Sequence, residues 1–319
     1  MAISGLAKIR DKNTLAVFGE IIKMHGVLRS EVSAKTGISL MTVGKIMEAL
    51  LARGIIFERE HHTIAAGRKP LLAYPELEKW WCCAFSITDK ISLDILSLDL
   101  KIIYSDTVAL CGDDWTACFT SAISKAYEYI EANSLDFDAC IGIGVSAPAP
   151  YNAALDRVMC PKRKNLESLR IKRLLREAFS TDIYIDEDVK LAALATLDSF
   201  PEYCGEKIFY MYVDVGVGGV LLINGEIYRG ADEYAGDIGQ LMFSNGMTVE
   251  DYLSLESLNE QLSAHSIDLN KGNTADDMAL NGIVDDYTEK MAITVYNATC
   301  MYSPAAIIID GSFEQLGQG

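Results

Sequence analysis

Apolar residues near the N-terminus recur every three to four positions, which is the period of an amphipathic helix. The pattern predicts a helix from Asn13, as its cap, to about Met24, a short helix over 30–35, and a third helix capped by Ser39. Short apolar stretches on either side of a polar turn then predict two paired strands. The first 75 residues are therefore expected to form three helices and a β-hairpin.

The rest of the chain alternates between strand-like and helix-like segments. The expected strands are 82–88, 92–98, 102–109, 140–145, 183–185, 208–213, 220–223 and 307–309, and the expected helices are 116–133, 166–179, 189–197 and 274–302. Three strands followed by helix–strand units occur near the start and begin again after about residue 207. This order predicts a duplicated α/β domain with a cleft between its two lobes.

Charge divides the chain at about the same place as the pattern of elements. Residues 1–75 carry eleven Lys/Arg against six Asp/Glu, a net charge of +5, whereas the remainder carries seventeen against thirty-nine, a net charge of −22. A basic head on an acidic body favours a nucleic-acid-binding module at the N-terminus. We expect a DNA-binding domain over 1–75 and a sensor domain over 76–319.

Cysteine spacing and hydropathy bear on the compartment. The eight cysteines show no C-x-x-C motif and no Cys/His cluster with zinc-site spacing. No apolar stretch reaches the roughly 18 residues of a membrane span, and the first residues lack the apolar core of a signal peptide. We expect a cytoplasmic protein with reduced thiols and no membrane partner.

A helix, a tight turn at Gly37, a second helix and a β-wing form the arrangement that places a recognition helix in the major groove. The residues expected to contact phosphates or base edges are Ser39, Met41, Thr42 and Lys45 at the start of the third helix, and Arg68 and Lys69 in the wing. The alternative is a small bundle that mediates protein contacts or dimerisation. The charge asymmetry favours double-stranded DNA.

The stretch 27–43, together with Gly67-Arg68-Lys69-Pro70, resembles the repressor members of the ROK family (repressors, open reading frames and kinases), such as the N-acetylglucosamine and xylose repressors. The resemblance covers nearly the whole chain. It implies a winged helix-turn-helix followed by an actin-like, RNase H-like two-lobed sugar kinase fold over 76–319. Family members usually continue some tens of residues beyond the strand at 308–311.

The resemblance also implies a sugar site in the cleft. The segment 185–193 resembles the family motif in which an Asp accepts the proton of the attacking sugar hydroxyl, and 235–240 resembles Gly-Glu-Ile-Gly-His. The residues carried over to this site are Glu187, Asp188 as the former general base, Asp237, Gln240 and Glu250. Glu187 replaces the family's Asn, Asp237 its Glu and Gln240 its His. From the residues alone, 186–188 could instead serve only to cap a helix.

Three segments lack glycines that a kinase of this family uses to bind its nucleotide. The turn over 86–92 lacks glycine, Asp214 replaces the first glycine of the second phosphate loop, and Asp310 replaces a glycine on the adenosine side. The family's zinc-binding cysteines are absent near 244–248, and a zinc site needs about four N or S ligands. We therefore expect no catalysis, no cofactor and no metal.

Three functions remain to be weighed. The first is a repressor of carbohydrate genes that binds a DNA operator as a homodimer or a dimer of dimers and responds to a sugar or sugar phosphate. The second is a regulator whose kinase-like domain has lost sugar binding and serves in dimerisation or protein docking. The third is an active sugar kinase with an appended head.

Overall fold

The computed structural model of the chain describes residues 5–60, 70–110, 112, 114–160, 163–267 and 277–312. It divides into two compact units. The first comprises residues 1–145 and 170–184, and the second comprises 146–169 and 185–319. The division predicted at residue 75 remains a prediction.

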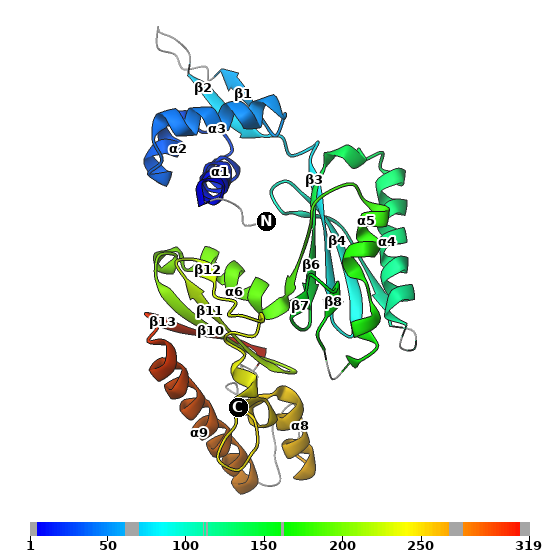
Figure 1. Ribbon diagram of the computed structural model, residues 1–319, viewed down its shortest axis with the longest axis vertical. Helices are drawn as coiled ribbons and strands as arrows, with labels where there is room; N and C mark the ends of the chain where they lie inside the picture. Colours follow the sequence, from blue (N-terminus) through cyan, green and yellow to red (C-terminus); the bar gives the residue numbers. More distant parts are fainter. Residues whose placement is uncertain are drawn as a thin grey trace. The chain divides into compact units, whose positions relative to one another are not determined.

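Three helices and a hairpin begin the first unit (Figure 1). They are α1 (Gly5–Met24), α2 (Arg29–Thr36), α3 (Leu40–Ala52), β1 (Ile56–Glu60) and β2 (Leu71–Pro75). The order of elements is the one predicted, and Ser39 caps α3 as expected by accepting a hydrogen bond from the Thr42 N–H. The prediction that Asn13 caps α1 is wrong, because this helix starts eight residues earlier and runs through Asn13.

The core of this N-terminal part extends into the sheet that follows. Val17 and Ile21 of α1 are fully buried, and Leu98, from beyond the head, joins the same cluster with 3% of its surface exposed. The Trp80 indole Nε1–H donates to the Gly54 carbonyl oxygen over 2.6 Å. The head is thus packed onto the first unit rather than tethered beside it.

A five-stranded sheet with the order β5-β4-β3-β6-β9 completes the first unit. Its elements are β3 (Trp81–Ile87), β4 (Lys90–Ser97), β5 (Ile102–Ala109), α4 (Trp115–Ala132), η1 (Phe137–Ala139), β6 (Cys140–Ala147), α5 (Ile171–Ala178) and β9 (Ile183–Glu187), of which β6 and β9 cross the division between the units. Alternate residues of β3 are buried, and Phe85 among them packs on Phe119 of α4 with ring centroids 5.2 Å apart. The alternation predicted for these strands reflects a sheet with one face on a helix.

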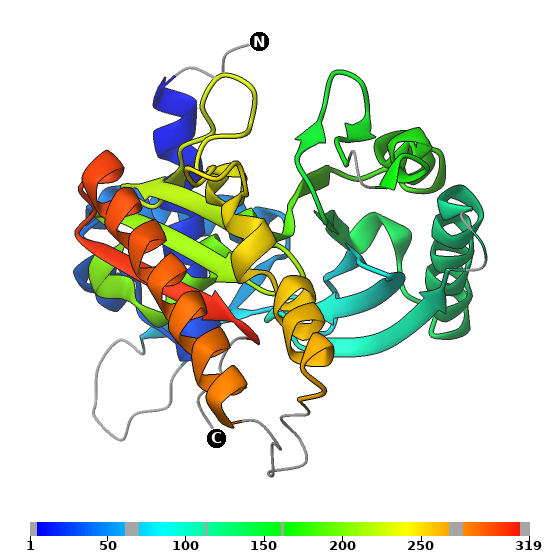
Figure 2. The ribbon, with the colours of Figure 1, turned by 90° about the horizontal axis from the view of Figure 1, so that it is seen from below.

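A four-stranded sheet with the order β12-β11-β10-β13 forms the centre of the second unit. Its elements are β7 (Tyr151–Asn152), β8 (Arg157–Val158), η3 (Leu166–Ser168), α6 (Asp188–Ser199), η4 (Pro201–Tyr203), β10 (Lys207–Val213), β11 (Val217–Ile223), β12 (Glu226–Ile227), η5 (Ile238–Gln240), α7 (Val249–Leu253), α8 (Leu255–Ala264), α9 (Asp277–Tyr302) and β13 (Ala306–Gly311). β10 pairs antiparallel with β11 and parallel with β13. Figure 2 shows α9 lying along one face of this sheet.

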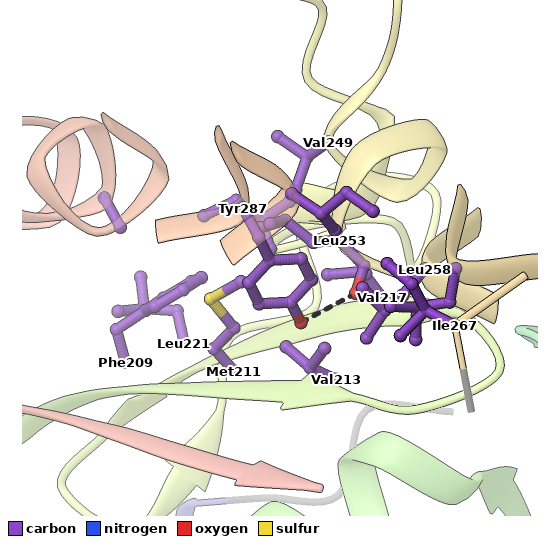
Figure 3. Close-up of a cluster of buried hydrophobic side chains, with 14 residues drawn as sticks. Phe209, Met211, Val213, Val217, Leu221, Val249, Leu253, Leu258, Ile267 and Tyr287 are labelled. Carbon is purple, nitrogen blue, oxygen red and sulfur yellow. Dashed lines mark hydrogen bonds between the residues drawn. The ribbon is translucent and has the colours of Figure 1, made fainter. Parts of the chain in front are cut away.

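Alternate residues of β10 enter two different cores. Tyr210 packs with α6 on one face, and Phe209 and Met211 pack with α7, α8 and α9 on the other. In that second core the Tyr287 hydroxyl donates to the Leu253 carbonyl oxygen over 3.0 Å (Figure 3). Because β10 is covered on both faces, its sequence reads as a continuous apolar segment.

Two further expectations need correction. The predicted helix over 166–179 is divided into η3 and α5, because Leu169 adopts an extended conformation. Helices α7 and α8 were not predicted; both are short and begin at hydroxyl caps, Thr248 and Ser254. Within the residues that the structure describes, no helix is both long and apolar enough to cross a bilayer.

Candidate functional site

The start of α3 presents the side chains predicted to contact DNA. Met41 is 75% exposed, and Lys45 is also exposed. The hydroxyls of Ser39 and Thr42 lie 2.9 Å apart, so each has a partner within the head. Arg68 and Lys69 lie outside the described residues. The surface that α3 offers to a ligand therefore centres on Met41 and Lys45.

An ion-pair cluster not predicted from the sequence fixes α3 in the head. The Arg29 Nη2 donates to Glu58 Oε1 of β1 over 3.0 Å, and its Nη1 lies 3.5 Å from Glu48 Oε1 of α3. One guanidinium thus joins α2, α3 and the hairpin, a fork geometry for which arginine is suited. The partners lie nineteen and twenty-nine positions away, so no local pattern indicates the contact.

The five residues predicted to bind a sugar all fall in the second unit. Glu187 ends β9 and Asp188 begins α6. Asp237 directly precedes η5, Gln240 ends it, and Glu250 lies in the first turn of α7. Gln240 and Asp188 are exposed, whereas Glu187, Asp237 and Glu250 are partly buried. The structure therefore presents this predicted site chiefly as a set of carboxylates.

Burial and mutual repulsion raise the pKa values of three of these carboxyls, Glu187, Asp188 and Asp237. Burial raises the pKa of Glu187 to about 7, against the lowering effect of Lys190. The pKa of Asp188 is raised by burial and by the nearby Asp214, and that of Asp237 by burial and by Glu250. Because these groups influence one another, they lie near each other within the second unit. The alternative role of 186–188 at the helix start stays open, because the N-cap Glu187 makes no side-chain cap bond but Asp188, in the first turn of α6, accepts a hydrogen bond from the Val189 N–H over 2.7 Å.

Lys190, which the sequence analysis missed, lies inside this group of carboxylates. Its side chain is 3% exposed, and its Nζ lies 3.1 Å from Glu187 Oε2 and donates to the Glu233 carbonyl oxygen over 2.7 Å. Arg229 in turn pairs with both Asp186 and Glu233. A Glu followed three positions later by a Lys at a helix start is a visible pattern that could have indicated the first contact.

Glu250 is engaged with the second phosphate loop rather than projecting freely. Its Oε2 accepts a hydrogen bond from the Val217 N–H over 3.3 Å, and a Cβ added to Gly216 would lie 3.2 Å from the same oxygen. The loop itself is closed by the Asp214 N–H, which donates to the Gly216 carbonyl oxygen. The Glu250 carboxylate thus occupies the Val217 backbone donor in this loop.

Close backbone packing holds Asp237 beside β11. A Cβ on Gly239 would lie 2.0 Å from the Val217 carbonyl oxygen, and one on Gly219 would lie 2.5 Å from the Gly236 carbonyl oxygen. Only glycine allows such contacts. The glycines of the segment 235–240 therefore position the carboxylate, whatever it binds.

Among the described residues, no group of three or more His, Cys, Asp or Glu side chains is placed to hold a metal ion. The described cysteines are free thiols. Burial raises the pKa of Cys83 and raises that of Cys140 to about 11, so these two thiols are protonated at neutral pH.

With this geometry in view, the comparisons with known proteins define the class. The ROK family profile matches residues 88–318. The chain belongs to the ROK family, and it has the family's mixed α/β, actin-like sugar kinase fold. The family contains both regulators and kinases.

Among curated proteins, the chain is similar to the xylose repressors of Bacillus spizizenii (21% identity, covering 76% of this chain and 63% of that protein) and of Caldicellulosiruptor bescii (19%, 97% and 85%). It is also similar to the DNA-binding transcriptional dual regulator NagC of Escherichia coli (18%, 75% and 59%). The chain thus spans about three-fifths of the length of two of these three relatives.

Among solved structures, a ROK family transcriptional regulator, a homologue of the E. coli MLC protein, aligns with a TM-score of 0.73 at 15% identity, covering 96% of this chain and 84% of that one. A ROK hexokinase from Thermus thermophilus aligns with a TM-score of 0.56 at 17% identity, covering 73% and 82%. The regulator alignment includes most of the N-terminal head, whereas the kinase alignment covers only about three-quarters of the chain. At these identities the likeness establishes the fold.

Proposed function

We propose that this protein is a DNA-binding transcriptional regulator, a repressor of carbohydrate-utilisation genes, whose ROK domain responds to a sugar. The observation that carries the proposal is the exposed start of α3, where Met41 and Lys45 project from a head with a net charge of +5. An exposed lysine can contact phosphate or guanine, and a methionine can contact a thymine methyl group. The relatives named as repressors and regulators support the same function.

DNA binding is tested by fluorescence anisotropy with a labelled duplex from the region upstream of this gene. We expect Lys45→Gln to weaken binding and to lower the slope of log K against log [salt] by about one. Arg53→Gln is the matched control, because it removes one charge from the opposite end of the same helix. An absence of binding by the wild-type protein at low salt would contradict the proposal.

A neutral sugar fits the second unit better than a sugar phosphate. Glu187, Asp188 and Asp237 lie close enough to influence one another, and Lys190 is already paired with Glu187. Carboxylates accept hydrogen bonds from sugar hydroxyls, whereas they repel a phosphate. In a thermal-shift panel of neutral sugars and sugar phosphates, we expect stabilisation by a neutral member.

One observation favours the second candidate, a domain that has lost sugar binding and serves in dimerisation or docking. The Lys190 ammonium forms an ion pair with Glu187, which is one of the residues that the family resemblance assigns to the sugar. A flat response across the whole panel, with DNA binding intact, would favour this candidate.

We further propose that the domain does not transfer phosphate. Glu250 accepts a hydrogen bond from the Val217 N–H, and Asp214 lies in the same loop, so two carboxylates lie at the loop that the family resemblance assigns to the phosphates. Each would repel the nucleotide. ATP-dependent phosphorylation of any member of a hexose panel by the purified protein would contradict this.

A further inference from the structure

A short hairpin, 241–248, separates two residues of the candidate sugar site, Gln240 and Glu250. Its tip is closed by the Phe243 N–H, which donates to the Met247 carbonyl oxygen over 2.8 Å. Backbone bonds of this kind fix the shape of a hairpin, but a lone hairpin is marginally stable until its side chains pack on another element. The contacts that hold this hairpin on the second unit are therefore those of its side chains.

Side chains from three elements meet at the hairpin. The rings of Phe243, in the hairpin, and Tyr252, in α7, form an edge-to-face pair with centroids 5.3 Å apart. Asn245 Nδ2, at the hairpin tip, donates to the Tyr252 hydroxyl over 2.6 Å. Lys290 Nζ, from α9, lies 5.4 Å from the ring centroid of Tyr252 and 5.9 Å from that of Phe243. These four residues are called the hairpin cluster.

The hairpin cluster is anchored in the core of the second unit. Phe243 and Tyr252 both pack against the buried group that contains Leu253. The Lys290 side chain is 17% exposed, and its Nζ lies 3.0 Å from Asp286 Oδ1, one turn earlier on α9. An ammonium over an aromatic ring is attracted by the negative ring face, and more strongly where water is partly excluded. The cluster therefore joins the hairpin to α7 and α9.

The family resemblance implies a zinc site in this part of the chain, but the residues present do not fit one. The segment 240–251 contains no cysteine and no histidine. Its one aspartate, Asp251, already accepts a hydrogen bond from the Thr248 N–H over 2.8 Å. A structural zinc ion needs four donors, most of them thiolate or imidazole. The donor set here does not supply them.

We propose that Tyr252 and Lys290 are positioning residues, which hold the hairpin on the second unit without a metal ion and thereby keep Glu250 in place. The hairpin leads directly into α7, because its last residue, Thr248, is the N-cap of that helix. Glu250 lies two positions before Tyr252 in α7, and its Oε2 accepts the Val217 N–H over 3.3 Å. A helix of five residues depends on side-chain packing for its position. Loss of the Tyr252 contacts should therefore also loosen the bond of Glu250 to Val217.

The test is hydrogen–deuterium exchange of the full chain, with Tyr252→Leu beside the matched control Tyr296→Leu. Tyr296 is 68% exposed on α9 and lies outside the hairpin cluster. We expect Tyr252→Leu to speed exchange at least about tenfold in peptides that cover 241–249 and 214–218, and the control to change neither. The second peptide reports positioning, because a role confined to packing of the hairpin would change only the first.

Two milder variants keep the test decisive if Tyr252→Leu does not fold. Tyr252→Phe keeps the ring pair and loses only the bond from Asn245, so we expect a smaller rise in exchange over 241–249. Lys290→Met keeps a long side chain and removes the ammonium, and it should speed exchange in both peptides.

Metal content is measured on the same preparation by elemental mass spectrometry. We expect less than about 0.1 zinc ion per chain, and a melting temperature that EDTA leaves unchanged, because a structural zinc ion contributes folding free energy where one is bound. About one zinc ion per chain, together with a lower melting temperature after chelation, would overturn the proposal.

Two exchange results would also overturn it. One is the same exchange over 241–249 in the Tyr252 variants, in Lys290→Met and in the control. The other is faster exchange over 241–249 with no change over 214–218, which would remove the positioning of Glu250. None of these measurements uses DNA or a sugar, so their outcome is independent of the proposed function.

Discussion

Replacing Lys190 with methionine is the sharpest test of the charge arrangement in the second unit. Methionine keeps a long unbranched side chain but removes the ammonium that lies 3.1 Å from Glu187 Oε2 and donates to the Glu233 carbonyl oxygen. Removing one partner of a buried pair leaves the other charge unpaired, which typically costs about 3–5 kcal/mol. We expect a smaller loss, about 2–3 kcal/mol at about pH 8, because the remaining Glu187 carboxyl can take up a proton.

The loss depends on pH because Glu187 can take up a proton. Its pKa is raised from the ordinary 4.5 to about 7, so the folded state holds this proton more tightly than the unfolded state. The contribution of this group is fully present below pH 4.5 and is lost as the pH rises through 7. At about pH 5.5 Glu187 is neutral in both proteins, and only the hydrogen bonds of Lys190 are lost, at about 1–2 kcal/mol. At about pH 8, one unit above the pKa of Glu187, the ionised form is favoured by only about 1.4 kcal/mol, so the destabilisation is larger by about that amount.

Urea unfolding measures this difference, with two probes that separate the units. All three tryptophans, Trp80, Trp81 and Trp115, belong to the first unit, so their emission reports that unit, whereas far-UV circular dichroism reports both. Lys207→Met, which removes an exposed lysine that donates to a carbonyl oxygen of the second unit, serves as the control and should lose under about 1 kcal/mol at either pH. Equal destabilisation of Lys190→Met at both pH values, or none at about pH 8, would refute the reasoning.

Two further substitutions test the packing described above. Gly239→Ala places a Cβ 2.0 Å from the Val217 carbonyl oxygen and should destabilise the second unit by more than about 3 kcal/mol. Gly144→Ala is the control: no atom lies within 4 Å of its added Cβ, so it should change stability by under about 1 kcal/mol. Similar thermal shifts in both variants would contradict the close contact at Gly239. Trp80→Phe removes the indole donor to the Gly54 carbonyl oxygen and should destabilise the head by about 1–3 kcal/mol. We expect this loss to appear as faster amide hydrogen exchange in α3. Unchanged exchange in α3 would show that the hydrogen bond does not stabilise the head.

Much of the head was predictable because its determinants are local. Apolar spacing and the Ser39 cap predicted α3 with its correct start, since a cap bond joins residues only three positions apart. The start of α1 was missed because Asn13 has the composition of a cap, yet the helix continues through it. Composition at one position cannot exclude an earlier start when the preceding residues also tolerate a helix.

The residues of the candidate sugar site could be predicted from the sequence, but most of the contacts among them could not. Motif positions located Glu187, Asp188, Asp237 and Glu250 in the chain. The pairing of Lys190 with Glu187 lies within one helical turn and was therefore available from the sequence. Its contact with Glu233, forty-three positions away, was not.

The sequence by itself therefore determined the order of elements, the basic head, the family resemblance and the loss of kinase glycines, because each is written in local pattern or composition. Only the tertiary structure decided which groups meet. It brought the Glu250 carboxylate to the Val217 N–H, seated Leu98 in the core of the head, and closed Gly239 onto the Val217 carbonyl oxygen. Each of these contacts joins segments more than twenty positions apart, and such contacts depend on how sheets and helices pack rather than on the preferences of the residues themselves.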